Sequence, residues 1–417
     1  MSLSKESTEL IAEIFPFLNE VKGKQNFLKK KMINNTVKYI YNEIQQAQGL
    51  IKSLIENNKI TQTIDIFEDK KNVELPSLFN SRFVVSYIKT YVKKHIYGTI
   101  TLNVFLLGHT IDIIFYLLEP EDDANYILGN PLILNILTWL YIAAKNSKKH
   151  CAETLTIHSF MTPFKKNLPE NDYEILSPEH CNSAVTTSCT KNGEICIFRK
   201  EEFLKVLIHE SFHIFGLDFS GLPISRLKKN ILKIFPIQSD MELAESYSET
   251  WATIMNAFIC ANNLMEKPNF SEFLAYADFC IGLEQFFSLF QLIKILNFMN
   301  LNYRNLYDKD ELSVSSRRYL YREKTNVFTY YILKTVFLCN IDLFLDWCKI
   351  NNIKKDGNIF NFYKTSENLD HFGQLIKNIY DKKPILEKIS IVEKISSDIN
   401  SPLNLLRTTR MTLCELN

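Results

Sequence analysis

A strong charge of either sign is missing from the sequence. Its 417 residues include 48 Lys and Arg and 47 Asp and Glu, which leaves a formal net charge of +1. Such a chain has no overall field that would attract nucleic acid or an anionic membrane surface. We therefore expect neither as a partner. Hydrophobic residues make up 46% of the chain, which is enough to bury a large core.

Long apolar runs are missing as well. The two most apolar stretches, residues 101–118 and 131–144, are both interrupted by polar side chains. Neither reaches the roughly 20 clean apolar residues that a membrane-spanning helix needs. The first residues, Met1 to Glu6, lack the apolar stretch of a signal peptide. We expect a soluble protein in the cytoplasm.

The nine cysteines lack the even number and regular spacing of a disulfide framework. Most of them lie in apolar runs, where a free thiol behaves as a small hydrophobic side chain. We therefore expect free thiols and a reducing compartment. Cys181, Cys189 and Cys196 lie near His180, but the close cysteine pairs of a structural zinc site are absent. We expect no metal cluster at these residues.

Internal repeats and low-complexity linkers are absent too, and the length predicts roughly two or three subdomains. Apolar residues such as Leu10, Ile14 and Leu18 recur at helical spacing near the start. We predict a helical N-terminal domain over residues 1–150, a catalytic core over residues 151–265 and a helical C-terminal domain over residues 266–417.

The pattern changes to that of strands near residue 153. The sequence Asn192-Gly193 is typical of a hairpin turn between two of these strands. A helix is predicted to follow over residues 201–215, with Gly216 as its natural end. The predicted strands cover residues 155–160, 184–189 and 194–199.

The segment His209-Glu210-Ser211-Phe212-His213 carries the chemistry. Residues four apart share one face of a helix, so both imidazoles can point at one metal ion, and neutral imidazole suits zinc. Glu210 is placed to take a proton from a water that the metal activates. The alternative is a solvated helix face, which the preceding hairpin and the apolar neighbours disfavour. We predict His209 and His213 as zinc ligands and Glu210 as the catalytic base.

At this point the chain resembles the zincin superfamily of metallopeptidases over about residues 153–255. Zincins place an H-E-x-x-H helix behind a sheet whose edge strand binds the substrate backbone, and here residues 195–198 lead directly into the predicted helix. Together with residues 245–252, the motif is also similar to predicted metallopeptidases of giant DNA viruses. For a viral chain the compartment would be the host cytoplasm or the virion.

The resemblance implies a third zinc ligand, because a catalytic zinc keeps three protein ligands and a water. In the gluzincins this ligand is a glutamate on a later helix, and an acid four residues further on supports a histidine ligand. Glu245 and Glu249 fit this spacing. Glu245 is then the ligand and Glu249 its supporter. In a variant of this reading Glu249 is the ligand, and in the alternative both are surface acids.

A rival reading is similar to the metzincins, whose motif H-E-x-x-H-x-x-G-x-x-H continues past the first two histidines. Gly216 is in register with that motif, but Phe219 occupies the position of the third histidine and cannot bind metal. Asp218 is a carboxylate one residue too early, and a shifted turn would bring it in as an alternative ligand or a supporting carboxylate. We prefer for it the role of capping the turn, which predicts little effect on metal affinity. The gluzincin-like ligand set is preferred.

Two further features are candidates for contact with the substrate or the oxyanion. His158 lies on a predicted strand beside the motif, where a lone histidine is usually structural. Residues 323–331 are rich in aromatic side chains, and zincins often use a tyrosine or histidine to stabilise the oxyanion. At helical spacing such aromatic residues more often pack in a core.

The sequence therefore predicts an α+β protein, mainly helical, with a small sheet packed on the helix of the motif. Zinc is the expected cofactor, and a peptide or protein is the expected substrate, paired along residues 195–198 as the edge strand. Two alternatives stay open. One is a catalytically silent zincin fold, and the other is a helical scaffold that binds protein partners.

Overall fold

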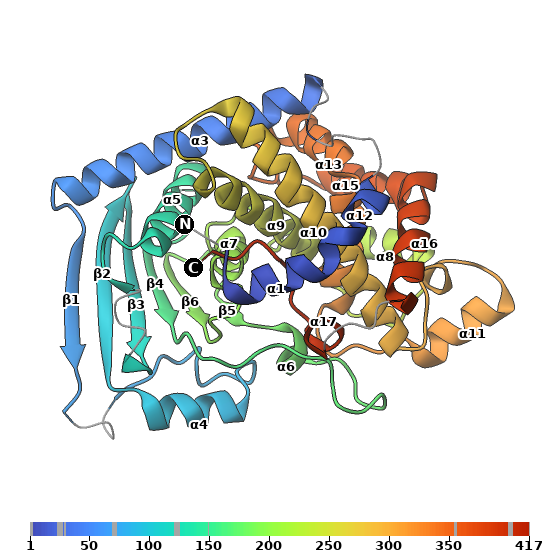
Figure 1. The fold of residues 1–417 in the computed structure, drawn as a ribbon, viewed down its shortest axis with the longest axis horizontal. Helices are drawn as coiled ribbons and strands as arrows, with labels where there is room; N and C mark the ends of the chain where they lie inside the picture. Colours follow the sequence, from blue (N-terminus) through green and yellow to red (C-terminus); the bar gives the residue numbers. More distant parts are fainter. Residues whose placement is uncertain are drawn as a thin grey trace.

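The computed structural model describes residues 3–22, 28, 31–68, 73–120, 126–148, 150–353, 357–398 and 403–416. It is an α+β structure, as predicted, with a six-stranded mixed sheet and a larger set of helices. Figure 1 shows the sheet on one side of the molecule and most of the helices on the other. The two ends of the chain lie close together between these two parts (Figure 1).

The sheet is antiparallel at both margins and parallel at its centre. β1, β2 and β3 pair antiparallel, β3, β4 and β6 pair parallel, and β5 returns antiparallel to β6. The central strands therefore run in one direction toward α7, which follows β6. In spatial order the strands are β1 (Thr61–Ile66), β2 (Gly98–Leu106), β3 (His109–Leu117), β4 (Thr154–Ser159), β6 (Asn192–Ile197) and β5 (Ala184–Thr186).

The prediction of an all-helical region over residues 1–150 is wrong for β1, β2 and β3. In β2 every second residue from Ile100 to Leu106 is buried, which is the period of a strand with one face on a core. Gly108, at a φ of 97°, completes the tight connection to β3. Three strands of the sheet precede residue 151 and three follow it, so the sheet crosses that predicted boundary.

The strands predicted after residue 153 are confirmed as β4, β5 and β6, with a different turn between the last two. Asn192 and Gly193 already belong to β6, opposite Thr154 and Leu155 of β4. Gly193 serves a close approach instead of a turn, because a Cβ there would come within 2.6 Å of the Ile214 side chain at the end of α7. The connection is made by residues 187–191.

Helices cover both faces of the sheet. On one face a smaller core joins α4 residues such as Ile88 and Val92 to Tyr116, Phe160 and Phe198. The other face packs into the main core with α3, α5 and α7. The helices up to α9 are α1 (Lys5–Ile14), α2 (Leu18–Lys22), α3 (Lys31–Glu56), α4 (Ser86–His95), α5 (Pro131–Asn146), α6 (Pro178–Cys181), α7 (Phe203–Ile214), α8 (Ser225–Ile234) and α9 (Leu243–Asn263).

The rest of the described chain is mainly helical and packs on α9. Its first helix, α10 (Phe270–Phe298), is long and apolar enough to cross a membrane, but 89% of its most apolar window is buried inside the protein. Its apolar side chains thus face protein. The others are α11 (Glu311–Leu320), a π-helical turn (Phe328–Leu333), α12 (Lys334–Cys339), α13 (Ile341–Cys348), α15 (Ser366–Ile379), α16 (Lys383–Asp398) and α17 (Leu403–Arg407).

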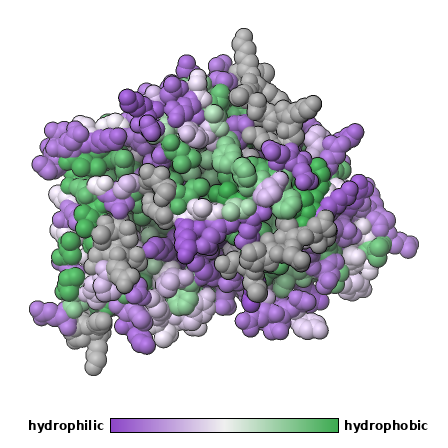
Figure 2. Space-filling view, in the orientation of Figure 1, coloured by the Kyte–Doolittle hydropathy of each residue, from purple (hydrophilic) through white to green (hydrophobic). Residues whose placement is uncertain are grey.

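The outer margin of the sheet exposes apolar side chains. Ile64 and Ile66 of β1 and Phe105 of β2 are each more than half exposed. Figure 2 shows the corresponding apolar surface at the left rim of the molecule, where β1 and β2 lie. The opposite margin, at β5, is the one that lies beside α7.

Candidate metal centre

The motif helix is confirmed as α7, which is buried along almost its whole length. It begins directly after Glu202, whose φ of 60° turns the chain sharply out of β6. It ends at Ile214, Phe215 caps it, and Gly216 follows at a φ of 66°, the left-handed conformation that glycine adopts without cost. Its neighbour α9 lies alongside and contributes the acids.

Three side chains from these two helices converge on one point. The Nε2 atoms of His209 and His213 lie 3.2 Å apart. An Oε2 oxygen of Glu245, in the first turn of α9, lies 3.0 Å from His209 Nε2 and 3.4 Å from His213 Nε2. The structure thus brings together the two predicted histidines and the preferred third residue, as a group able to hold a metal ion.

The size of this triangle matches the space around a tetrahedral metal ion. Donors placed about 2.0–2.1 Å from zinc at tetrahedral angles lie about 3.3 Å from one another. The three observed edges, 3.0, 3.2 and 3.4 Å, span this value. Without an ion, three such atoms would need shared protons to approach so closely. Two imidazoles and one carboxylate are a donor set that fits zinc.

Each imidazole is held in place from behind by a second carboxylate. His209 Nδ1 lies 2.9 Å from Glu249 Oε2, and His213 Nδ1 contacts Asp218 Oδ2. A proton on each Nδ1 leaves the lone pair of Nε2 free and aims it at the common point. This pairing of a ligating histidine with an outer carboxylate is the usual way in which a metal site is oriented.

Asp218 therefore does more than cap the turn after α7. Its Oδ1 accepts hydrogen bonds from the Ser220 amide and hydroxyl, at 3.0 and 2.8 Å, which is the capping role. Its Oδ2 contacts His213 and also accepts a hydrogen bond from Ser248 Oγ at 3.2 Å. Since it meets Nδ1 and not Nε2, the Asp218 carboxylate stands outside the triangle.

The metzincin-like position is filled by packing. Phe219 is fully buried and contacts the rings of Tyr247, Phe362 and Phe372. A side chain in this aromatic cluster points away from the two histidines. The third position of that motif is thus part of the core that joins α7 to α9 and α15.

Lys205 is a site residue that the sequence reasoning missed. Its ammonium group forms a fully buried ion pair with Glu249 Oε1, on the carboxylate that also holds His209. Lys205, His209 and His213 follow one another at intervals of four, so all three lie on one face of α7. A lysine one turn before the first histidine of an otherwise apolar helix was the available signal.

The charges of the centre stabilise one another. Burial alone would lower the pKa of His209, but hydrogen bonds and charges from Glu245 and Glu249 raise it to about 9. The pKa of His213 is likewise raised against burial, by Glu245 and Asp218. Against the effect of burial, the two histidines hold the pKa of Glu245 well below its usual range. The pocket is therefore built to hold positive charge among carboxylates.

Glu210 lies next to this centre in a small cavity of about 40 Å³. Burial raises the pKa of its carboxyl group, although the neighbouring His209 and His213 act in the opposite direction. A raised pKa brings a carboxylate closer to the range in which it exchanges protons at neutral pH. Tyr330, in the π-helical turn, lines the same cavity, and its ring centroid lies 5.9 Å from that of His209.

The strand that borders the cavity is β5 and not the predicted segment 195–198. β6 is an inner strand, with β4 on one side and β5 on the other. Ser183 and Ala184, at the start of β5, line the cavity together with Glu210. The chain returns after α6 so that β5 lies on the outer side of β6. The hairpin pattern in the sequence did not show which of the two strands lies at the edge of the sheet. His158 has the structural role that the sequence favoured, since its Nδ1 lies 3.0 Å from the Tyr116 hydroxyl oxygen in the smaller core.

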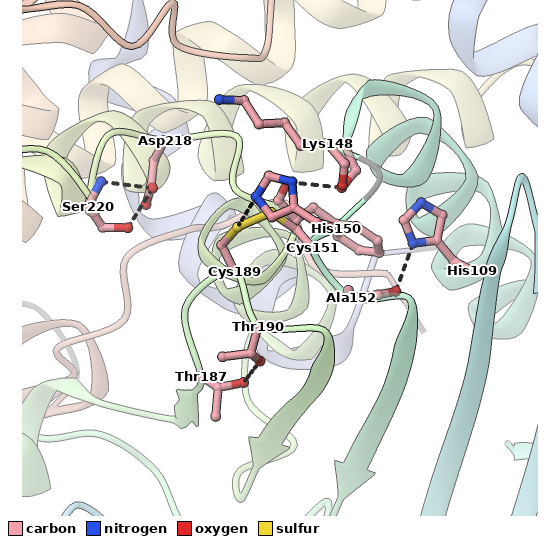
Figure 3. The surroundings of a disulfide bond; sticks show 12 residues. His109, Lys148, His150, Cys151, Ala152, Thr187, Cys189, Thr190, Asp218 and Ser220 are labelled. Atoms are coloured by element: carbon pink, nitrogen blue, oxygen red, sulfur yellow. Dashed lines mark hydrogen bonds between the residues drawn. A yellow bond between two sulfur atoms is a disulfide. The ribbon is translucent and has the colours of Figure 1, made fainter.

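A disulfide supports the end of α7, contrary to the expectation of free thiols. Cys151 and Cys189 are bonded, while the other seven cysteines are free. The Cys189 amide donates to the His213 carbonyl at 3.1 Å, and a Cβ on Gly216 would come within 2.9 Å of Cys151 Sγ. Figure 3 shows the disulfide with His150 beside it. The irregular spacing hid this pair because β4 and β6 bring its cysteines together.

Comparison of the chain with protein-family models, with curated proteins and with solved structures finds no match in any of the three. The geometry of the centre is therefore the basis for its function.

Proposed function

We propose that the protein is a zinc-dependent peptidase with a gluzincin-like ligand set. One observation carries the proposal: His209, His213 and Glu245 form a triangle of donor atoms, while each imidazole is held at Nδ1 by another buried carboxylate. An accidental pair of histidines on a helix would have neither the third donor nor the two outer partners. The same order of residues supports the resemblance to zincins.

Zinc fits this site better than magnesium or calcium, because two of the three donors are imidazole nitrogens. When bound, zinc supplies a Lewis acid that polarises a carbonyl group and lowers the pKa of a water. The chain supplies the remaining functions: it orients the two imidazoles through their Nδ1 atoms, keeps the site nearly closed to solvent and positions Glu210 at the cavity.

In the proposed reaction Glu210 transfers a proton. It takes one from the water that attacks the peptide carbonyl carbon, and it gives this proton to the leaving nitrogen as the C–N bond breaks. Burial favours the first step, because it raises the pKa of the Glu210 carboxyl group and makes the carboxylate a stronger base. Tyr330, which also lines the cavity, is the residue that we assign to donate a hydrogen bond to the carbonyl oxygen as it gains negative charge.

A peptide in extended conformation is the substrate that the site favours. β5 pairs with β6 on one side, and among the described residues no strand pairs with its other side. An extended peptide can add to such an edge through main-chain hydrogen bonds. Because Ser183 and Ala184 lie at the cavity, a peptide on this edge would pass Glu210.

The test combines metal content with turnover. Purified protein should hold zinc at the His209–His213–Glu245 site and cleave members of a peptide library. Glu210→Gln should keep this zinc and lose cleavage, by roughly 100-fold or more, because an amide cannot accept the proton. Glu242→Gln, at an exposed acid just before α9, is the matched control and should cleave like the wild type.

Two results would overturn the proposal. In one, the protein takes up no zinc at this site even when zinc is supplied during folding. In the other, Glu210→Gln cleaves peptides as fast as the wild type. Zinc uptake without any cleavage would favour the catalytically silent alternative.

A further inference from the structure

A second group of possible metal ligands lies in the helical part of the molecule. The sulfur atoms of Cys260, Cys280 and Cys414 all lie within 4.8 Å of one another, and all three residues are buried. Cys260 comes from α9, Cys280 from α10, and Cys414 from the segment of residues 408–415. No part of the candidate peptidase site belongs to this group.

The main chain at Cys414 is held by side chains one turn from the other two cysteines. Glu284, four residues after Cys280 on α10, accepts hydrogen bonds from the amides of Leu413 and Cys414, at 2.9 and 2.8 Å. Asn256, four residues before Cys260 on α9, donates to the Cys414 carbonyl. The three thiols are thus fixed in position by the same two helices that carry them.

Glu284 has one carboxylate oxygen that these contacts do not use, although it is not a member of the group of three sulfur atoms. Its Oε1 accepts the hydrogen bonds from the two amides and one from the Thr412 hydroxyl at 2.6 Å. Its Oε2 is buried and has no hydrogen-bond partner among the described residues. A buried carboxylate oxygen without a partner is costly, and such a group in a native structure calls for an explanation, of which a bound ion is one.

We propose that Cys260, Cys280, Cys414 and Glu284 form a structural zinc site. Four donors in a tetrahedron suit a structural zinc, and sulfur atoms about 2.3 Å from the ion lie about 3.8 Å apart. The three sulfur atoms lie within 4.8 Å of one another and Glu284 is not in this group, so binding would draw the sulfur atoms together and turn Glu284 Oε2 toward them. Binding exchanges the three thiol protons, released to solvent, for one divalent cation.

The site would join three parts of the chain that are distant in sequence. The ion would fasten the 408–415 segment to α9 and α10. A dry cluster of thiols explains the cysteines as small hydrophobic side chains, but it leaves the Glu284 oxygen without a partner. A tetrahedral ion accounts for both observations.

Cobalt(II) separates this site from the peptidase site, because only a thiolate ligand gives a sulfur-to-cobalt charge-transfer band. The protein is produced with cobalt in place of zinc, so that the buried site fills during folding, and is purified under reducing conditions. We expect two ions per chain by native mass spectrometry and a charge-transfer band in the near ultraviolet. The His209–His213–Glu245 site contains no sulfur, so His213→Ala should lose one ion and keep the band.

The cysteine variants locate the band. Cys280→Ser should abolish or strongly weaken it, while Cys348→Ser, an equally buried free cysteine on α13, should leave it unchanged. The pair Cys151 and Cys189 could contribute thiolates if reduced, so the double variant Cys151→Ser with Cys189→Ser is needed and should retain the band.

The wild-type protein alone can overturn the proposal, so the result does not depend on whether a variant folds. One cobalt per chain without a charge-transfer band contradicts it. A disulfide between two of the three cysteines, found by mass spectrometry after alkylation, contradicts it as well. A charge-transfer band that persists in folded Cys280→Ser protein also contradicts the proposal. Loss of peptidase activity has no bearing on any of these readouts.

Discussion

Two acids four residues apart on α9 have different tasks at the metal centre. Glu245 reaches the Nε2 side of both histidines, whereas Glu249 reaches the Nδ1 side of His209 and pairs with Lys205. The spacing of the sequence allowed either to be the ligand. The difference arises from the position of α9 along α7, which sets the first acid opposite the gap between the imidazoles.

Alanine variants of the three acids should rank in zinc affinity. Glu245→Ala should be the most severe, because a donor atom is lost. Glu249→Ala and Asp218→Ala should each weaken binding by about 10–100-fold, as expected for partners that orient a ligating histidine. This replaces the small effect expected for Asp218 from the sequence, since its Oδ2 contacts His213. Competition with a chromogenic chelator measures the three affinities.

Glu242→Ala, at an exposed acid next to the same helix, is the control and should bind zinc like the wild type. If Glu249→Ala or Asp218→Ala proved more severe than Glu245→Ala, the assignment of Glu245 as the third ligand would be wrong.

Tyr330→Phe should lower kcat on a cleaved peptide by roughly 10–100-fold while KM changes little. The hydroxyl group is proposed to act on the oxygen that becomes negative in the transition state, so its loss affects the reaction more than substrate binding. Steady-state kinetics on the best library peptide separates the two constants. If KM rose by a similar factor while kcat stayed unchanged, Tyr330 would be assigned to substrate binding alone.

At the scale of the secondary-structure elements, the end of α7 depends on one glycine. Gly216 has a φ of 66°, and a Cβ there would meet Cys151 Sγ at 2.9 Å. Gly216→Ala should therefore destabilise the protein by about 1–3 kcal/mol. Gly221→Ala is the matched control, since nothing lies within 4 Å of its Cβ position, and should change stability little. Urea unfolding measures the stability of both variants, and equal unfolding midpoints would show that a Cβ at position 216 causes no strain.

β4 carries a histidine that makes stability depend on pH. Burial lowers the pKa of His158 to about 4, from an ordinary value of 6.5. Between these values the unfolded chain binds a proton that the folded protein does not, so this group reduces stability as the pH falls from 6.5 to 4. Over the full pH range, this difference in pKa corresponds to a loss of stability on the order of 3 kcal/mol.

Replacement by His158→Gln should remove this part of the pH dependence. The free energy of unfolding of the wild type should fall relative to that of the variant between pH 6.5 and pH 4, and the difference should be constant above pH 7.5. Urea titrations at several pH values measure it. Parallel pH curves for the two proteins would contradict a buried neutral imidazole.

Local patterns predicted the elements around the motif well, and long-range pairing limited the rest. α7, β4 and the hairpin strands followed from residue spacing, because apolar period and turn residues act over a few positions. The strand pair at residues 98–117 lies in the region predicted as helical, since a short apolar run fits either structure. The edge position of β5, the Cys151–Cys189 bond and Lys205 at Glu249 depend on contacts between distant segments, which no local pattern contains.

At the scale of the whole molecule, the 408–415 segment connects the sheet side to the helical side through hydrogen bonds to both. Glu202, just before α7, accepts hydrogen bonds from the amides of Met411 and Thr412 at 2.6 Å, and it pairs with the buried Lys166. Lys334 of α12 donates to the Met411 carbonyl at 2.9 Å. Met411 itself lines the cavity of the candidate site.

Removal of one member of this network should destabilise the whole protein. Glu202→Ala leaves Lys166 buried without its partner, which costs about 3–5 kcal/mol. Glu9→Ala, which removes an exposed ion pair with Lys5, is the control and should change stability by less than about 0.5 kcal/mol. Denaturant unfolding measures both. If both variants changed the free energy of unfolding by a similar small amount, the network would add little to stability.

The 408–415 segment also sets the order of folding events. The segment donates hydrogen bonds to Glu284, Glu202 and His180, which close sequence separations of 130, 209 and 229 residues. Contacts that close such large loops lose the most chain entropy, so they form after the local helices and hairpins. A refolding chain should therefore regain its helical signal early, while zinc uptake and resistance to proteolysis wait for a slower final step.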